Sequence, residues 1–238
     1  MGKVILVGAG PGDPDLITLK GLRAIMLADV IVYDKNIPKK LLEYARRDCK
    51  LIYVGKDPYN KNIITQEEIN KILEDEARRN NVVVRLKCGD PYIFGRGAEE
   101  CEYLLERGIE CEVVPGVSSI NGVLAYAGIP LTAKGVAECF YVCSAIVEGG
   151  RLFNFSSVPK ECTLVILMIS KNFSKIIDEL IQVRGPNELA AIIEKGTTEC
   201  QNVREGKLIE LRNEKVESPA LLVVGRVIEF RRKLWKLS

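Results

Sequence analysis

The sequence contains no histidine among its 238 residues. This absence excludes Ser-His-Asp and Cys-His catalysis, and it excludes every metal centre that depends on imidazole ligands. Any proton transfer must therefore be carried out by carboxylate, lysine or tyrosine side chains.

The eight cysteines include no Cys-x-x-Cys pair. Zinc ribbons and ferredoxin-type clusters use such close pairs, so the spacing argues against both, and we predict no metal site. We expect the cysteines to be reduced thiols, most of them buried as small apolar side chains.

The sequence also lacks an excess of charge of either sign. Lysine and arginine total 34 against 32 aspartate and glutamate residues, a net charge of +2. The chain has no large overall positive charge that would favour binding to nucleic acid. Any anionic partner must therefore be bound by a local group of basic residues. No apolar run approaches the length of a membrane span, and the apolar run at residues 4–7 reads as a strand rather than a signal sequence. We expect a cytoplasmic protein without membrane contact.

Apolar runs alternate with helical patterns along the first half of the chain. Such alternation, with strands apolar on both faces, predicts a mainly parallel sheet covered on both sides. Asp13 before Pro14 suits a helix start, and Thr65 with Glu68 forms a capping box. The predicted strands are residues 4–7, 30–33, 51–54, 82–86 and 112–114, and the predicted helices are 16–28, 39–46, 66–79 and 98–107.

The composition changes after Pro115, where small residues become frequent. We place a boundary there, which gives an N-terminal lobe of residues 1–115 and a C-terminal lobe of residues 116–238. The fold class is α/β, with two α/β lobes, a mainly parallel sheet in the first and a mixed sheet in the second. A ligand is expected in a cleft between the lobes, beyond the carboxyl ends of the first sheet's strands. The second lobe shows one clear helix, at 173–183, and strands near 139–143, 164–169, 190–194, 203–211 and 221–227.

Three predicted strands end in glycine-containing turns, at residues 8–14, 89–91 and 115–119. Glycine lets the backbone approach a ligand closely, so these turns predict a binding site. The first turn, G-A-G-P-G-D, invites comparison with the dinucleotide fingerprint G-x-G-x-x-G. Asp13 at the third glycine would repel a pyrophosphate, and Pro11 lacks a backbone donor. An NAD-dependent oxidoreductase therefore stays an alternative, and a nucleoside ligand without phosphates fits better.

Nine segments stand out along the chain: GAGPGDPDLITLKG, IVYDK, YVGK, TQEEIN, VVRLKCGDPYIFGRG, VVPGVSS, YAGIPLT, EKGTT and SPALLVVGRV. They resemble segments of uroporphyrinogen-III C-methyltransferases, in the tetrapyrrole methylase family. The resemblance spans almost the whole chain and implies a homodimer of two-lobed chains, with S-adenosylmethionine held between the lobes. It also implies methylation of uroporphyrinogen III at carbons 2 and 7, which yields precorrin-2 and S-adenosylhomocysteine.

The resemblance also implies a set of donor-binding residues. Among them, the Asp90 carboxylate can accept hydrogen bonds from ribose hydroxyls, and Met168 can cover the base or the sulfonium group. Ordinary core packing is the alternative for Met168, and a plain turn role is the alternative for Asp90. The positions that match are Pro11, Cys88, Gly89, Asp90, Ile93, Ser118, Ser119, Met168, Gly196 and Ala220.

Two positions are implied as catalytic: Asp34 as a proton acceptor and Lys56 as a donor. The alternatives are a helix cap and a solvated lysine. Uroporphyrinogen carries eight carboxylates, so its site must be cationic although the chain is nearly neutral. The substrate-binding candidates near the predicted turns are Lys35, Lys61, Lys87, Arg96 and Lys134.

The sequence departs from the usual family pattern at several positions. Lysine replaces arginine at position 35, Cys88 replaces a glycine, and residues 57–62 run one residue longer. Histidines common in the family are absent from Ala133-Lys134 and from residues 142–145. A methyltransferase for a later corrin intermediate or for a protein-bound diphthamide precursor stays open, as does a non-catalytic adenosyl-binding module. At this length we expect no fused dehydrogenase or ferrochelatase domain.

Overall fold

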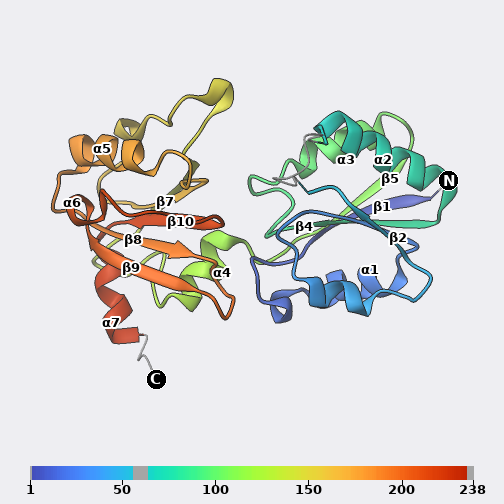
Figure 1. Cartoon of the computed structure of the whole chain (residues 1–238), viewed down its shortest axis with the longest axis horizontal. Coiled ribbons are helices and arrows are strands. Elements are labelled where there is room, and N and C mark those ends of the chain that lie inside the picture. Colours follow the sequence, from blue (N-terminus) through green and yellow to red (C-terminus); the bar gives the residue numbers. More distant parts are fainter. Residues whose placement is uncertain (1, 56–63, 235–238) are drawn as a thin grey trace. The chain divides into compact units, whose positions relative to one another are not determined.

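A computed structural model describes residues 2–55 and 64–234 of the chain (Figure 1). The chain forms two compact units, Met1–Ser119 and Ile120–Ser238. The division falls a few residues after the boundary expected at 115/116. Within the described residues, no helix is long and apolar enough to cross a membrane.

The sheet of the first unit contains five strands in the order β3-β2-β4-β1-β5. Every neighbouring pair is parallel. The predicted parallel sheet is thus confirmed, and parallel pairing places the carboxyl ends of all five strands along one edge. The strands are β1 (Lys3–Gly8), β2 (Val30–Tyr33), β3 (Lys50–Tyr53), β4 (Val82–Lys87) and β5 (Glu110–Val114).

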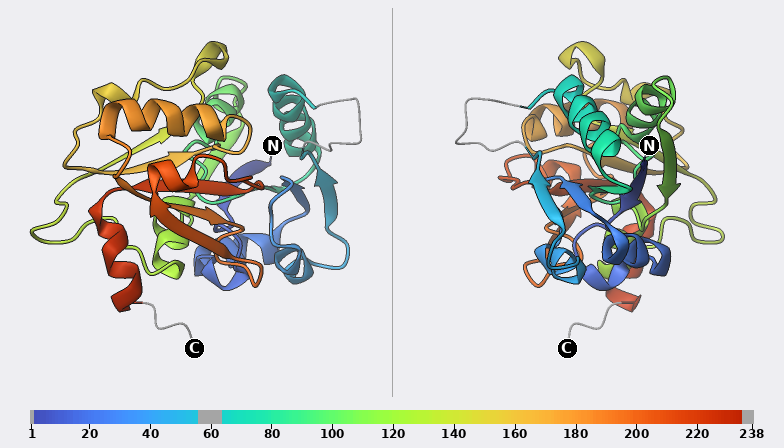
Figure 2. Two further views of the ribbon diagram at one scale, coloured as in Figure 1. Left: turned by 60° about the vertical axis from the view of Figure 1, so that its left-hand side comes forward. Right: turned by 90° about the vertical axis from the view of Figure 1, so that its right-hand side faces the viewer.

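Helices cover both faces of this sheet (Figures 1 and 2). Along β1, Val4 and Leu6 pack in one apolar cluster with α2 and α3, whereas Ile5 and Val7 pack in another with α1. This alternation follows from the two-residue period of a strand. The helices are α1 (Leu19–Leu27), α2 (Gln66–Arg79) and α3 (Gly97–Leu105), with short 3₁₀ helices at Pro14–Leu16 and Lys39–Tyr44.

Local capping signals fix two of these helix starts. The Thr65 hydroxyl accepts from the Glu68 N–H at 3.2 Å, and the Glu68 carboxylate accepts from the Thr65 N–H at 2.7 Å. This capping box confirms the prediction, as does Asp13 at the start of the first 3₁₀ helix. The helix predicted at 39–46 is instead a 3₁₀ helix with only Leu41 buried, so it has little apolar surface to support regular α-helix.

The second unit contains a mixed sheet in the order β6-β7-β10-β8-β9. Only β6 and β7 are parallel; the other neighbouring pairs are antiparallel. The predicted mixed sheet is confirmed. Its strands are β6 (Phe140–Ser144), β7 (Thr163–Leu167), β8 (Leu189–Glu194), β9 (Asn202–Lys207) and β10 (Ala220–Val224).

Two expectations for the second unit were wrong. The strand predicted at 203–211 ends at Lys207 and gives way to a helix, because Leu208 and Leu211 bury the same face three residues apart. The expectation of a single clear helix was also wrong, because the small residues after Ser118 form another one. The helices are α4 (Ser119–Tyr126), α5 (Phe173–Arg184), α6 (Leu208–Leu211) and α7 (Arg231–Leu234), with 3₁₀ helices Glu148–Gly150, Phe155–Ser157 and Arg226–Phe230.

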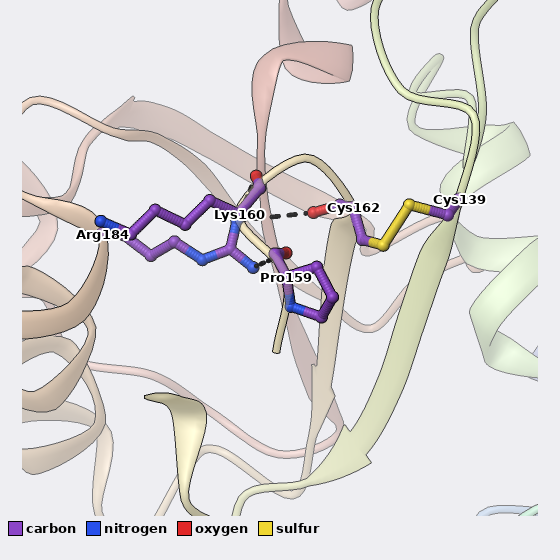
Figure 3. The surroundings of a disulfide bond; sticks show 5 residues. All are labelled: Cys139, Pro159, Lys160, Cys162 and Arg184. Atoms are coloured by element: carbon purple, nitrogen blue, oxygen red, sulfur yellow. Dashed lines mark hydrogen bonds between the residues drawn. A yellow bond between two sulfur atoms is a disulfide. The ribbon is translucent and has the colours of Figure 1, made fainter. Parts of the chain in front are cut away.

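Four of the eight cysteines form disulfides, which corrects the expectation of reduced thiols. Cys101 on α3 bonds to Cys111 on β5, and Cys139 bonds to Cys162 (Figure 3). The second pair lies one step before the parallel register that joins Phe140 to Thr163. Strand pairing therefore brings together two cysteines that lie 23 residues apart in the sequence.

Arg184, at the end of α5, holds the loop that carries Cys162 (Figure 3). Its guanidinium donates to the carbonyl oxygens of Lys160 at 2.8 Å, Pro159 at 3.0 Å and Cys162 at 3.5 Å. Burial lowers the pKa of Arg184. The buried cation thus donates to three carbonyl oxygens of the segment that leads into β7.

We expect each disulfide to contribute about 3 kcal/mol to the free energy of unfolding, because each constrains the unfolded chain. Thiol titration of the denatured, non-reduced protein should find the four free cysteines at positions 49, 88, 143 and 200. A reductant should lower the melting temperature, whereas Cys200→Ser should leave it unchanged because Cys200 is exposed and unbonded. Eight titratable thiols in freshly purified protein would contradict the pairing.

Candidate functional site

Three turns meet at the carboxyl edge of the first unit's sheet, after β1, β4 and β5. A Cβ at Gly116 would lie 2.4 Å from the Gly89 carbonyl oxygen and 2.7 Å from the Gly8 Cα. A Cβ at Gly8 would likewise meet Gly89 and Gly116 backbone atoms at 2.6 Å. The three backbones therefore touch at a point where Gly8 and Gly116 leave no space for a side chain, and we call Gly8, Gly89 and Gly116 the glycine junction.

Backbone hydrogen bonds join the first two turns. The Gly89 N–H donates to the Gly10 carbonyl at 2.8 Å, and the Gly10 N–H donates back to Gly89 at 3.3 Å. Both residues have positive φ angles, of 78° at Gly10 and 67° at Gly89. These hydrogen bonds fix the positions of the two turns relative to each other beside the strand ends.

Asp90 clamps the turn after β4 onto the turn after β5. One carboxylate oxygen accepts from the Tyr92 N–H at 2.8 Å, and the other accepts from the Gly116 N–H at 3.0 Å. A carboxylate has about four acceptor positions, so Asp90 keeps capacity for a ligand hydroxyl while it braces the turns. The plain turn role and the ligand role expected for Asp90 are therefore compatible.

The other donor-site candidates of this unit surround the same turns. Ser118 is buried, and the Gly89 Cβ position is 3.8 Å from the Ser119 backbone nitrogen, at the start of α4. Pro11 is partly buried beside Gly10. Ile93 is 38% exposed, so its side chain is open to a ligand.

Cys88 stands where a glycine is common in the family, and its side chain is accommodated at the end of β4. Burial, with a contribution from the negative charge of Asp34, raises the pKa of the Cys88 thiol to about 11. The thiol is protonated at neutral pH, so it is a poor nucleophile. Asp34 lies beside the end of β4, because the preceding residue, Tyr33, pairs with Leu86.

Asp34 directly follows β2 and pairs with a buried arginine. Its Oδ1 accepts from Arg85 Nη2 at 2.7 Å, and the side chains of Asp34 and Arg85 are 31% and 2% exposed. Arg85 Nη1 also lies 3.4 Å from the carbonyl oxygens of Val32 and Leu86. Asp34 is thus a fixed carboxylate with one side open to solvent, rather than a helix cap.

Arg85 was missed by the sequence reasoning. The signal was present, because Arg85 and Lys87 are charged residues that alternate with apolar ones in V-V-V-R-L-K and so share one face of β4. A charged residue inside a buried parallel strand needs a partner, and here the partners are Asp34 and Glu100.

Lys87 was predicted to bind substrate, but its side chain is 3% exposed and its ammonium contacts Glu100 at 2.8 Å. Burial and the nearby Arg85 lower its pKa. Lys87 therefore belongs to a buried ion cluster and cannot reach a substrate carboxylate in this conformation.

The remaining cationic candidates differ in their surroundings. Lys35 and Lys134 are exposed, in the first and second unit respectively. Arg96 is exposed and forms a two-pronged contact with Glu99, with Nε 3.0 Å from Oε1 and Nη2 2.5 Å from Oε2. Lys56 and Lys61 lie outside the described residues.

In the second unit, the predicted donor residues gather at one edge of the mixed sheet. Met168 follows β7, Gly196 lies two residues after β8, and Ala220 begins β10. Because β10 runs antiparallel to both neighbours, its start lies beside their ends. The Lys195 N–H donates to the Pro219 carbonyl at 2.9 Å, which joins two of these segments.

Met168 and Gly196 have different surroundings: the Met168 side chain is exposed, whereas Gly196 packs against a helix. Met168 is 56% exposed with a φ of 61°, so the core-packing alternative is wrong. Its sulfur accepts from the Ser144 hydroxyl at 3.5 Å. A Cβ at Gly196 would lie 2.3 Å from Val123 on α4, so this glycine allows the turn after β8 to pack against the helix.

The sequence profile of the "Tetrapyrrole (Corrin/Porphyrin) Methylases" matches residues 3–212. The chain belongs to this family. A protein of the same family, the uroporphyrinogen-III C-methyltransferase of Methanocaldococcus jannaschii, is 46% identical over 236 residues, which cover 95% of this chain and 97% of that relative.

Two further comparisons agree with the family. Siroheme synthase 2 of Cronobacter sakazakii is 43% identical over 98% of this chain, which spans about half of that longer protein, 52%. The crystal structure of the Thermus thermophilus uroporphyrin-III C-methyl transferase with S-adenyl homocysteine matches with a TM-score of 0.82 and 40% identity, covering 96% of this chain and 99% of that one. Tetrapyrrole methylases thus share the α/β architecture described above.

We expect Asp90→Ala to weaken S-adenosylhomocysteine binding by about 1–3 kcal/mol, because two backbone N–H groups and a ligand hydroxyl would lose their acceptor. Calorimetry on the purified variant measures this change. Glu99→Gln changes a nearby exposed carboxylate without touching the turns and should bind the nucleoside normally. Unchanged affinity in Asp90→Ala would remove Asp90 from the donor site.

Proposed function

We propose that this tetrapyrrole methylase transfers methyl groups from S-adenosylmethionine to carbons 2 and 7 of uroporphyrinogen III, giving precorrin-2. One observation carries the proposal above all. The likeness to a uroporphyrinogen-III C-methyltransferase extends over 97% of that relative at 46% identity. The related Thermus structure with S-adenyl homocysteine supports the choice of methyl donor.

The glycine junction is suited to a nucleoside rather than to a diphosphate. It places backbone groups and the Asp90 carboxylate side by side at the strand ends, and that carboxylate can accept from ribose hydroxyls. The first turn does not offer an anion cradle, because the Asp13 carboxylate itself accepts from the Asp15 N–H at 2.9 Å. A pyrophosphate there would meet a negative charge, which disfavours the NAD alternative.

Bound S-adenosylmethionine would supply an electrophilic methyl group to a pyrrole carbon and leave as S-adenosylhomocysteine. In this proposal the turns around Gly89 and Ser118 orient the donor, and orientation provides much of the rate. Methylation leaves the tetrapyrrole with a proton to lose. Asp34 accepts that proton at its open oxygen, while Arg85 holds the other oxygen at 2.7 Å.

Exposed cations would bind the substrate carboxylates. We propose Lys35, Arg96 and Lys134 for this role, and Lys56 and Lys61 stay predictions from the sequence. Glu99 occupies the Nε and Nη2 side of the Arg96 guanidinium and orients it, which leaves Nη1 to donate to a substrate carboxylate. Lysine at position 35 keeps the charge that arginine carries elsewhere in the family but gives up the two-pronged geometry.

We expect increasing salt to raise the KM for uroporphyrinogen III much more than the KM for S-adenosylmethionine, because salt screens exposed charge pairs. Initial rates at several ionic strengths, with one substrate varied at a time, measure the two constants. Equal salt sensitivity of both constants would argue against recognition of the substrate by exposed cations.

The deciding experiment is anaerobic incubation with S-adenosylmethionine and uroporphyrinogen III generated in situ, followed by mass spectrometry of the pigment. The expected product carries two added methyl groups. A pigment of unchanged mass would overturn the proposal. If a later corrin intermediate is methylated in its place, the alternative substrate is correct, and methyl transfer to either excludes a non-catalytic adenosyl-binding module.

We also propose that the enzyme works as a homodimer in the cytoplasm and that its product serves sirohaem and cobalamin synthesis. The support is the family resemblance alone. Light scattering coupled to size-exclusion chromatography should give twice the 26.5 kDa chain mass. A mass of one chain at micromolar concentration would overturn the dimer.

A further inference from the structure

Glu100 on α3 is a fully buried carboxylate, with a side chain that is 0% exposed. Its Oε1 accepts from three donors: Lys87 Nζ at 2.8 Å, Gln66 Nε2 at 3.1 Å and Arg85 Nε at 3.3 Å. Among the residues that the structure describes, Oε2 has no hydrogen-bond partner. One oxygen of Glu100 is therefore the common anchor of two buried cations.

The contact with Arg85 connects Glu100 to Asp34. Arg85 places Nε on Glu100 and Nη2 on Asp34 Oδ1, at 3.3 Å and 2.7 Å. Since a guanidinium is planar and rigid, fixing Nε on one side fixes where Nη2 points on the other. Glu100 thus sets the plane in which Arg85 meets the Asp34 carboxylate, without touching Asp34 itself.

The strand pattern explains why these groups share one site. Arg85 and Lys87 follow Val83 at two-residue steps, so all three face α2 and α3. Asp34 follows Val32 of the neighbouring strand β2 in the same way, and Val32 packs on that face. The helix α3 supplies the only carboxylate that Arg85 and Lys87 both contact among the described residues.

We propose that Glu100 is a positioning residue for methyl transfer: acting through Arg85, it holds the Asp34 carboxylate in the orientation in which it accepts the substrate proton. This inference rests on the proposed role of Asp34. Stability alone does not account for the cluster, because replacing buried ion pairs by apolar residues is often neutral or stabilising. A fixed direction for Asp34 is what an apolar replacement could not supply.

Lys87 makes the cluster depend on Glu100. Burial and the positive charge of Arg85 lower the pKa of Lys87, whereas Glu100 counteracts that shift. Without the Glu100 charge, the two cations would face each other with Asp34 as their remaining carboxylate. Arg85 Nε would also lose its partner, so the plane in which the guanidinium meets the Asp34 carboxylate would no longer be fixed.

Glu100→Gln tests the proposal because it keeps the shape of the side chain and removes its charge. We expect the single-turnover rate of methyl transfer to fall about tenfold, the scale of coupling between groups in one network. The Kd for S-adenosylhomocysteine should stay unchanged, because the glycine junction and Asp90 are intact. Glu100→Asp keeps the charge and shortens the side chain, and its single-turnover rate should also be lower than that of the unmodified protein. This variant replaces Glu100→Gln in the test if the glutamine variant does not fold.

The double variant Asp34→Asn/Glu100→Gln separates positioning from a general loss of stability. If Glu100 acts through Asp34, the double variant should be no slower than Asp34→Asn alone. If the fold-reduction in rate of the double variant equals the product of the two single reductions, Glu100 acts independently of Asp34, and the inference is overturned. The matched control is Glu74→Gln, which breaks a different buried cluster, with Arg78 and Tyr103, that does not contact Asp34. It should lower the melting temperature without lowering the rate.

The same measurements distinguish this inference from the proposed function. A wild-type protein that does not methylate uroporphyrinogen III overturns the proposed function and, with it, the role of Glu100. Full activity in Asp34→Asn overturns the role of Asp34 and therefore the positioning role. A slow Asp34→Asn beside a fully active Glu100→Gln overturns the inference about Glu100 alone.

Discussion

Asp34→Asn should lower the single-turnover rate of methyl transfer by about 10²–10⁴-fold, the contribution expected from a positioned general base. The asparagine keeps the size of the side chain and can still accept from Arg85 Nη2, now 2.7 Å from Oδ1, but it cannot take up a proton. The chain has no histidine that could replace it. Rapid quenching of one turnover, followed by mass spectrometry, measures the chemical step without interference from product inhibition.

Two controls accompany this measurement. Asp48→Asn removes a carboxylate whose side chain is 78% exposed in the same unit and should leave the rate unchanged. Binding of S-adenosylhomocysteine to Asp34→Asn should match the unmodified protein, because Asp34 lies outside the turns proposed to bind the donor. Full activity of Asp34→Asn would mean that the proton is lost to solvent after release.

Gly116→Ala should abolish high-affinity binding of S-adenosylhomocysteine and lower the free energy of unfolding by about 1–3 kcal/mol. The added methyl group would lie 2.4 Å from the Gly89 carbonyl oxygen, and its neighbours are backbone atoms that cannot rotate away. The turns after β4 and β5 must then separate, which breaks the 3.0 Å contact between Asp90 and the Gly116 N–H. Calorimetry and thermal unfolding report the two effects.

Gly185→Ala is the matched control, because it also adds one methyl group to a glycine. Gly185 has a φ of 96° and no atom within 4 Å of its Cβ position, so the substitution costs backbone strain without a collision. It should lower stability while leaving nucleoside binding intact. Normal binding by Gly116→Ala would show that the glycine junction does not shape the donor site.

Local patterns determined most of the secondary structure. The helix predicted at 66–79 matches α2 at both ends, because the Thr65 capping box fixes its start and an amphipathic pattern carries it to Arg79. Doubly apolar strands predicted the parallel sheet, and parallel pairing places the glycine turns on one edge. The position of the candidate donor turns thus follows from strand and turn patterns alone.

The predictions for residues 203–211 and for the cysteines were wrong because the partners of these residues lie far away in the sequence. Leu208 and Leu211 extend the strand pattern of 203–207 but are buried as a helical turn. Cys139 and Cys162 carry no close-pair motif and meet because β6 and β7 pair in parallel register. Short-range propensity is a weak signal in such cases, and tertiary packing decides.

The sequence by itself determined the fold class and the chemical types available to the site, because strand periodicity, capping signals and glycine turns act over a few residues. The family followed from the resemblance of nine sequence segments to known members. Only the tertiary structure decided which charges are free to meet a ligand. Lys87 looks like Lys35 in the sequence, yet Lys87 is buried on Glu100 whereas Lys35 is exposed. That difference depends on which helix covers β4, and the burial of a charge is set by partners that come together only in the folded chain.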